Sequence, residues 1–259
     1  MKIVVLVKQV PEPTATWQYS PDLTLDRGSV ESRLSELDEY AVEQAVRLVE
    51  NGLPATITFV TMGPADAAEG LRKALAMGGD DAIHIQDDGL HGSDALATSL
   101  VLAKAVETIG YDLVVCGMAS TDAEMSVVPA MVAERLGVPQ LTFASSLSVA
   151  DGSVTIEREG DGETQEVVAS LPAVVSVTDQ TGEARYPSFR AIMAGKKKPI
   201  TTWSLSDVGV APSQVGLGAS ATATRNAAQH PPRQSGTIVV DEGDGAVQLA
   251  DFLVASKLL

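Results

Sequence analysis

The sequence predicts a doubly wound α/β fold, in which helices cover both faces of a mainly parallel sheet. Segments typical of strands and of helices alternate four times between Lys2 and Leu136. Such alternation predicts parallel strands joined by right-handed crossovers. The hydrophobic content is 45%, whereas aromatic residues make up only 4%. A core built mainly from Ala, Val and Leu is typical of parallel strands that are buried on both faces.

The strands of these four units are short apolar runs. They are expected at Lys2–Lys8, Ala55–Met62, Asp81–Gln86 and Asp112–Gly117. The first strand is followed by a long polar segment, Gln9–Leu34, which contains prolines and is expected to be a loop.

The helices show apolar residues at helical spacing. They are expected from Ser35 to Val49, over Ala65–Met77, from Ser93 to Ile109 and over Glu124–Leu136. Ser35 precedes the first helix with Asp38 three residues later, which is the spacing of a capping box. Ser93 is expected to cap the third helix.

After Pro139 the pattern changes to strands. These are expected at Leu141–Val149, Val154–Glu159, Gln165–Ser170 and Ala173–Val177. The second and third flank an acidic Gly-Asp-Gly turn, which predicts a β-hairpin. We expect the last strand to join the sheet and the hairpin to extend it.

The chain is predicted to divide into a nucleotide-binding α/β domain, residues 1–190, and an extended C-terminal arm, residues 191–259. Ser206–Gly236 is rich in Ser, Ala, Thr, Gly and Pro and lacks periodicity, so it is not expected to fold alone. A strand at Thr237–Asp241 and an apolar helix at Ala246–Leu258 follow. The residues alone fit two interpretations equally: a linker that returns to its own domain, or an arm that lies on another molecule.

Composition excludes several classes of function. The formal net charge of −16 argues against nucleic-acid binding, which requires a basic surface. Cys116 is the only cysteine, and the three histidines are scattered, which argues against a metal site. No apolar run approaches the roughly 18 residues of a membrane span, and the apolar N-terminus is too short for a signal peptide. We expect a cytoplasmic protein without a membrane span.

A candidate site lies where the carboxyl ends of the parallel strands meet, since open α/β sheets bind ligands there. The segment Gly117–Pro129 reads G-M-A-S-T-D-A-E-M-S-V-V-P, a loop of small residues that enters a helix. Amides at a helix N-terminus can hold a phosphate, although on the residues alone an ordinary loop is the simpler interpretation. Asp122 is expected to cap this helix and Glu124 to lie in its first turn. No nucleophile or acid–base partner accompanies them, so no catalytic residue is expected.

The stretch from Ile156 to Pro199 carries a resemblance to a known family. The acidic turn, Gln165, Val167 and P-A-V-V from Pro172, followed by R-Y-P-S-F-R-A-I-M-A-G-K-K-K-P, resemble the signature of the electron-transfer flavoprotein β subunit. The resemblance extends from M-K-I-V-V-L-V-K-Q-V to the C-terminal helix. It implies an adenine-nucleotide α-hydrolase-like fold and a heterodimer with an α subunit that holds most of the contacts to FAD, with the arm wrapped around that subunit.

The resemblance also implies a function. Such a subunit is an electron carrier without its own catalysis. It passes electrons from acyl-CoA and related dehydrogenases of fatty acid β-oxidation to a membrane quinone oxidoreductase or another acceptor, and it binds AMP structurally.

The AMP pocket of the family maps onto residues at the carboxyl ends of the strands. These are Leu6, Ser35, Glu36, Leu37, Asp38, Met62, Gly117, Met118, Ala119, Ser120, Thr121, Asp122, Ala123, Glu124, Met125, Ser126, Val127 and Val128. Many members place Asn-Gln-Thr where this chain has Met125–Val128. Only Ser126 keeps a side-chain phosphate donor in that stretch.

Partner contacts are implied at two places. In the family, a large apolar residue at the position of Phe189 docks dehydrogenases, and Arg185, Tyr186, Ile192 and Met193 surround it here. Glu159 matches a glutamate that pairs with an arginine of the mobile flavin domain of the α subunit. On the residues alone, Phe189 could instead pack into its own domain and Glu159 could be an exposed hairpin charge. The Lys196–Lys198 run could be solvated or could steer an acidic partner.

Two other functions remain open at the level of sequence. An electron-bifurcating member would resemble this chain but hold a second FAD in place of AMP. A stand-alone ATP-binding signalling protein of the same fold would carry a Gly-rich G-x-x-G-x loop after the fourth strand, and Gly117 is not followed by that pattern.

Overall fold

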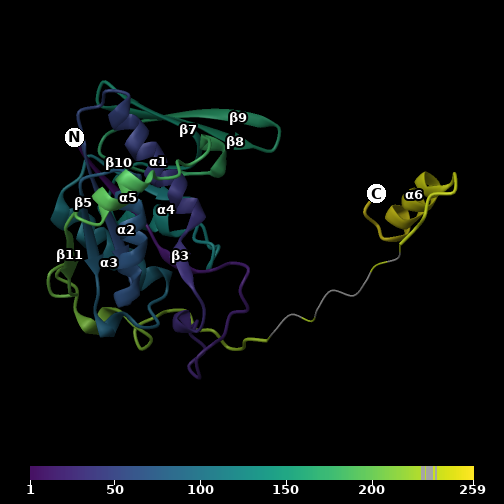
Figure 1. Ribbon diagram of the computed structural model, residues 1–259, viewed down its shortest axis with the longest axis horizontal. Coiled ribbons are helices and arrows are strands. Elements are labelled where there is room, and N and C mark those ends of the chain that lie inside the picture. The colour runs from purple at the N-terminus through teal and green to yellow at the C-terminus, as the bar shows by residue number, and fades with distance from the viewer. Residues whose placement is uncertain (229–230, 232–235, 237) are drawn as a thin grey trace. The chain divides into compact units, whose positions relative to one another are not determined.

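The computed structural model describes residues 1–228, 231, 236 and 238–259. It divides into two units, Met1–Arg225 and Asn226–Leu259, which are described separately. The first unit is built on a nine-stranded sheet of order β11-β5-β4-β1-β6-β10-β7-β8-β9 (Figure 1). The strands along the chain are β1 (Lys2–Leu6), β4 (Thr56–Met62), β5 (Asp81–Ile85), β6 (Leu113–Gly117), β7 (Gln140–Ala150), β8 (Ser153–Gly160), β9 (Glu163–Ser170), β10 (Ala173–Val177) and β11 (Ile200–Trp203).

The sheet is mainly parallel, as the alternating pattern predicts. The pairs from β11 to β7 are parallel, and only β8 and β9 run antiparallel to their neighbours. The helices of this unit are α1 (Glu36–Glu50), α2 (Ala68–Met77), α3 (Ala95–Ile109), α4 (Val128–Leu136) and α5 (Phe189–Gly195). The doubly wound α/β fold is therefore confirmed.

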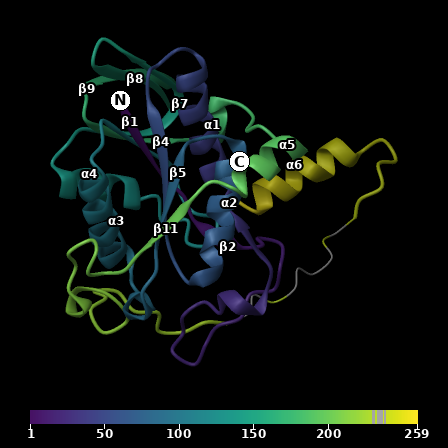
Figure 2. The same ribbon diagram turned by 60° about the vertical axis from the view of Figure 1, so that its left-hand side comes forward.

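Helices cover both faces of this sheet (Figure 2). Val5 of β1 packs in the apolar cluster that includes α1 and α2. Its neighbours Val4 and Leu6 pack in the cluster that includes α3 and α4. Successive residues of a strand point to opposite faces, so a strand buried on both faces must be apolar throughout.

The additions to the parallel sheet also follow the sequence prediction. β10 inserts between β6 and β7, and the β8–β9 hairpin pairs from Ser153↔Ser170 to Gly160↔Glu163. The turn between them contains Gly162, whose φ of 87° favours glycine. The predicted hairpin and its position at the end of the sheet are confirmed.

Several boundaries and caps differ from the prediction. Helix α4 begins at Val128 and not at Glu124, because Glu124 and Ser126 have φ values of 50° and 55°, which no α-helix accommodates. Helix α3 is capped by Asp94, whose carboxylate accepts from the amide of Ala97 at 3.0 Å, and not by Ser93. The side chain of Ser35 forms no cap hydrogen bond, so the predicted capping box at α1 is wrong.

The predicted loop Gln9–Leu34 contains a short antiparallel ribbon. β2 (Gln9–Pro11) pairs with β3 (Ser32–Leu34), and a 3₁₀ turn, η1 (Arg27–Ser29), lies between them. Each strand has only three residues, which is too short for an alternating pattern to be visible.

The first unit continues beyond the predicted boundary at residue 190. β11 pairs in parallel with β5 at the edge of the sheet. Val208, Val210 and Val215, which lie in the segment predicted not to fold alone, are buried in the apolar cluster on the α3 side. The segment gains its structure from the sheet that it covers and not from its own periodicity.

The second unit contains helix α6 (Gly245–Ala255), which confirms the predicted C-terminal helix with shifted ends. Most of its large apolar side chains are exposed, namely Val247, Leu249, Phe252 and Val254, whereas Leu253 is half-buried. Of the predicted strand Thr237–Asp241, residue 237 lies outside the described residues, and residues 238–241 form no strand. A search of the described helices finds none that is both long enough and apolar enough to cross a membrane.

Helix α5 packs closely on α2 through Gly195. A Cβ atom at this position would lie 2.8 Å from the backbone nitrogen of Ala76 and 2.9 Å from its Cα. We therefore expect Gly195→Ala to lower the free energy of unfolding by about 1–3 kcal/mol, as overpacking does. Gly218→Ala is the matched control, because nothing lies within 4 Å of its Cβ position. Urea unfolding of both variants tests this, and equal losses would contradict the predicted contact.

Candidate functional site

The carboxyl ends of β1 and β6 meet the first turn of α1. The carboxylate of Asp38 accepts a hydrogen bond from the backbone nitrogen of Lys8 at 2.8 Å. A Cβ atom on Gly117 would lie 2.6 Å from Asp38 Oδ1 and 2.7 Å from the carbonyl oxygen of Leu37. Only glycine allows β6 to end this close to α1. The structure thus brings together the predicted site residues from β1, α1 and β6.

Asp38 is a buried residue, with 6% of its surface exposed. Burial raises its pKa to about 7, although hydrogen bonds from the amides of Lys8 and Gly117 and the charge of Lys8 oppose this rise. Cys116, one residue before Gly117, is buried in the same region, and burial raises the pKa of its thiol. A carboxyl with a pKa near neutrality carries only part of a negative charge at the edge of the candidate site.

The loop after β6 is held by an ion-pair cluster. The side chain of Asp122 is only 2% exposed, and its carboxylate lies 2.8 Å from Lys8 Nζ and 2.6 Å from Arg27 Nη2. Burial opposes ionisation of Asp122, but the two cations outweigh it and hold its pKa at about 2. Lys8 Nζ also donates to the hydroxyl of Ser120 at 3.2 Å. The prediction that Asp122 caps the helix is wrong, because Asp122 binds two cations six residues before α4 begins.

Four buried polar atoms at this edge of the sheet have no hydrogen-bond partner among the described residues. They are Gln9 Oε1, Ser35 Oγ, Thr61 Oγ1 and Thr121 Oγ1. They follow β1, precede α1, lie near the end of β4 and follow β6, respectively. Leaving a buried hydroxyl unpaired costs free energy, so such groups point to a missing partner. The unpaired atoms of Ser35 and Thr121, which flank α1 and β6, therefore support the carboxyl edge as a candidate ligand site.

The remaining predicted site residues are spread around this centre. Leu6 is buried, and Met62 at the end of β4 packs against the same apolar cluster. Glu36 points to Arg33, with which it forms an ion pair at 2.9 Å. Met125 is exposed. Glu124 lies in the turn before α4, so its predicted place in the first turn of the helix is wrong.

Lys8, Arg27, Gln9 and Thr61 were not among the predicted site residues. Lys8 follows β1 by two residues at the carboxyl edge of the sheet, and that position is a usable signal. Arg27 lies in a polar segment without periodicity, where nothing in the sequence indicates its partner.

Phe189 is the first residue of α5 and is 79% exposed. The hydroxyl of Ser188 caps the helix by accepting from the amide of Ala191 at 3.3 Å. Tyr186 is 92% exposed, Met193 is also exposed, and Ile192 is half-buried. The alternative in which Phe189 packs into its own domain is therefore wrong.

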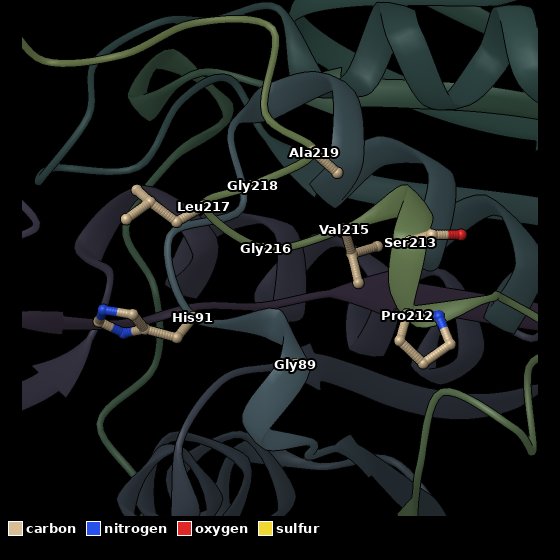
Figure 3. A pocket seen from close by; sticks show the side chains of 9 residues that line it. All are labelled: Gly89, His91, Pro212, Ser213, Val215, Gly216, Leu217, Gly218 and Ala219. Carbon is tan, nitrogen blue, oxygen red and sulfur yellow. The ribbon is translucent and has the colours of Figure 1, made fainter.

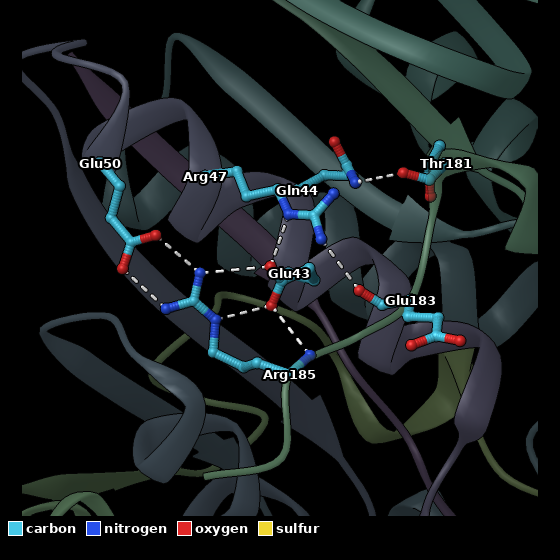
Figure 4. Close-up of polar contacts among 7 residues, drawn as sticks. All are labelled: Glu43, Gln44, Arg47, Glu50, Thr181, Glu183 and Arg185. Carbon is cyan, nitrogen blue, oxygen red and sulfur yellow. Dashed lines mark hydrogen bonds and ion pairs between the residues drawn. The ribbon is translucent and has the colours of Figure 1, made fainter. Parts of the chain in front are cut away.

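Two other predicted partner contacts lie in different surroundings. Glu159 is exposed near the tip of the β8–β9 hairpin, opposite Thr164. Arg185 forms ion pairs with Glu43 and Glu50 of α1 (Figure 4). Lys196 and Lys197 are exposed, whereas Lys198 donates to the carbonyl oxygen of Gly79.

A cavity of about 460 Å³ lies elsewhere in the first unit (Figure 3). It is lined by Gly89, His91 and residues 212–219 except Gln214, and none of the predicted site residues lines it. The Nε2 atom of His91 lies 2.9 Å from Asp22 Oδ2, so this ring already has a partner. The described residues contain no group of His, Cys, Asp and Glu side chains that could hold a metal ion.

Comparisons with known proteins agree on one family. The model of the electron transfer flavoprotein domain matches residues 22–208, which include α1, the loop after β6 and α5. The electron transfer flavoprotein subunit beta of Mycobacterium leprae is 44% identical over 266 residues, covering 99% of both chains. The Mycobacterium tuberculosis protein of that name is 43% identical with the same coverage. The Megasphaera elsdenii protein of that name is 32% identical over 271 residues, covering 100% of both chains.

The raised pKa of Asp38 predicts a pH dependence of stability. The folded state favours the protonated carboxyl, so this contribution is present below the ordinary pKa of 3.8 and is lost as the pH rises through about 7. We expect the free energy of unfolding to fall by roughly 3 kcal/mol between pH 5 and pH 8 for this reason. Asp38→Asn keeps a hydrogen-bond acceptor for the amide of Lys8 but should remove the pH-dependent fall in the free energy of unfolding.

Urea unfolding at several pH values measures the effect. Glu36→Gln is the control, because that exposed carboxylate lies two residues away on the same helix. Parallel pH profiles for Asp38→Asn and the unchanged protein would contradict the assignment.

Proposed function

The chain belongs to the electron transfer flavoprotein family as a β subunit, and on this premise we propose its cofactors, partners and electron path. It pairs with an α subunit, and the heterodimer carries electrons from acyl-CoA and related dehydrogenases to a membrane quinone oxidoreductase or another acceptor. FAD, held mainly by the α subunit, supplies the redox chemistry. This chain binds AMP as a structural ligand and contributes no catalytic residue.

The observation that carries the AMP proposal is the set of unpaired buried polar atoms at the carboxyl edge of the sheet. The hydroxyl groups of Ser35 and Thr121 would donate to the nucleotide or accept from it. In the loop after Gly117, the amides of Met118, Ala123 and Glu124 already donate to carbonyl oxygens, so other amides of the loop would bind the phosphate. The site residues therefore fit a nucleotide.

The charges near the site also fit an anion. Lys8 and Arg27 both pair with the single carboxylate of Asp122, so these three side chains together carry a formal charge of one positive unit. Asp38 is only partly ionised near neutral pH. Pro129 in the first turn of α4 has no N–H group, so side chains and the preceding loop must hold more of the phosphate than a helix N-terminus alone would.

The proposed dehydrogenase contact is the surface of Tyr186, Phe189 and Met193, whose apolar side chains are exposed beside Lys196 and Lys197. Exposed aromatic side chains of this kind serve as anchors in partner pockets. The neighbouring lysines would steer an acidic partner. Glu159 would contact the flavin domain of the α subunit, and the apolar face of α6 would lie on that subunit.

Cofactor content tests this proposal. Co-expression with the α subunit of the same organism should give a yellow 1:1 complex with one FAD and one AMP, measured by chromatography after acid denaturation. Two FAD and no AMP would indicate an electron-bifurcating member. A flavin-loaded monomer would overturn the proposal.

A matched pair of variants tests whether AMP binds at this site. Thr121→Val removes a buried hydroxyl without changing side-chain size, so AMP retention should fall while FAD content stays constant. Thr164→Val, on the exposed hairpin, should retain AMP. Loss of AMP from both variants, or from neither, would contradict the assignment.

Docking is tested by Phe189→Ala in the heterodimer. Removing an exposed anchor should weaken binding of the dehydrogenase about tenfold or more, as expected for a hot spot. Photochemical reduction of the flavin should not change, because the side chain lies outside the core. Leu96→Ala, another exposed apolar side chain, is the control. Titration of the heterodimer into the dehydrogenase gives the dissociation constants, and unchanged binding by Phe189→Ala would disprove the docking assignment.

A further inference from the structure

The segment that leads to Phe189 is attached to α1 by a network of charged and polar side chains (Figure 4). Arg185 forms a bidentate pair with Glu50, with both nitrogen–oxygen distances at 2.7 Å. Its Nε atom and its backbone nitrogen donate to Glu43 Oε2 at 2.7 and 3.1 Å. Arg185, main chain included, is thus fixed to two residues of α1 that lie about two turns apart.

Two more residues of α1 extend this network along the chain. Gln44 donates to the carbonyl oxygen of Thr181 at 3.0 Å. Arg47 donates to the carbonyl oxygen of Glu183 at 3.0 Å and to Glu43 Oε1 at 2.6 Å. Residues 182–188 form no helix or strand, so side chains must hold their backbone groups in place.

Glu43 is the centre of the network. Its side chain is 3% exposed. Burial opposes its ionisation, but the hydrogen bonds from Arg185 and Arg47 prevail and lower its pKa below the ordinary value. The same contacts with Glu50 and Glu43 raise the pKa of Arg185. Glu43 is too deeply buried to touch another protein, so any effect it has outside the domain must pass through Arg185 or Arg47, which both pair with it.

The other end of the segment is also fixed. Gly195, at the end of α5, lies against the backbone of Leu75 and Ala76 in α2. Arg72 of α2 donates to the carbonyl oxygen of Lys198 at 2.6 Å. Between these two attachments, Tyr186 and Phe189 project with exposed side chains.

We propose that Arg185 is a positioning residue, which is held by Glu43 and Glu50 and sets where Tyr186 and Phe189 meet the dehydrogenase. This inference rests on the proposed function and differs from the sequence-based expectation that Arg185 itself contacts the partner. A segment ordered in advance loses less conformational entropy on binding, which strengthens docking without a new contact. A planar guanidinium on a bidentate partner fixes orientation in a way that lysine does not.

The test uses the FAD-containing heterodimer and an acyl-CoA dehydrogenase that reduces it. Glu50→Gln and Arg185→Gln should weaken binding about threefold and about tenfold, respectively, within the range of coupled residues. Arg185→Lys should not restore binding. Glu107→Gln, an exposed carboxylate paired with Lys104 on α3, is the control for Glu50→Gln.

A double-mutant cycle separates positioning from direct contact. If Arg185 acts through Phe189, then Arg185→Gln should add little to the loss already caused by Phe189→Ala. Additive losses, with Glu50→Gln binding normally, would show that Arg185 contacts the partner and would overturn the inference.

Hydrogen exchange gives a readout that does not depend on the dehydrogenase. Amides of residues 183–189 should exchange faster in Arg185→Gln and Glu50→Gln than in Phe189→Ala or in the unchanged protein. Normal exchange in the first two variants would overturn the inference even if docking is weakened. A different outcome is that Phe189→Ala docks normally while amide exchange is faster in Arg185→Gln. That outcome would refute the docking surface, and the attachment of the segment to α1 would then have a structural role only.

Discussion

The close contact between the end of β6 and the start of α1 is the constraint on which the rest of the structure depends. Gly117 has no side chain, and the carboxyl group of Asp38 fills the space beside it and accepts from the amide of Lys8. The helix is therefore fixed at its first turn to two central strands of the sheet. Any side chain at position 117 would push α1 away and displace everything that α1 holds.

Helix α1 holds two regions through two buried carboxyl groups. Asp38 and Glu43 are five residues apart, which places them about 140° apart around the helix. One therefore faces the carboxyl edge of the sheet, and the other faces the segment before α5. Their electrostatics are opposite. Asp38 has no close cation strong enough to offset its burial, so its pKa rises, whereas two guanidinium groups lower the pKa of Glu43. The charge of Asp38 can therefore change near neutral pH, whereas Glu43 stays ionised there.

Much of the fold could be predicted because apolar periodicity is a local property. The strand–helix alternation, the hairpin and the presence of β10 in the sheet follow from it, whereas the place of β10 between β6 and β7 does not. The start of α4 could not be predicted, because Glu124 and Ser126 adopt positive φ values that their side chains do not indicate. β11 could not be predicted either, since Ile200–Trp203 becomes a strand only by pairing with β5 at the edge of the sheet.

For the candidate site, the sequence indicates which residues to consider but not which partners they contact. The family resemblance located Asp122 and Arg185, but their partners are set by tertiary structure. Asp122 meets Lys8 and Arg27, which are 114 and 95 residues away in the sequence, and Arg185 meets Glu43 at a separation of 142. A charged residue beside a functional segment can therefore act on a partner protein or on its own fold. Which of these two roles a cation has depends on how deeply its carboxylate partner is buried. A carboxylate as buried as Glu43 must keep its cation within the same domain, because leaving it unpaired would cost several kcal/mol.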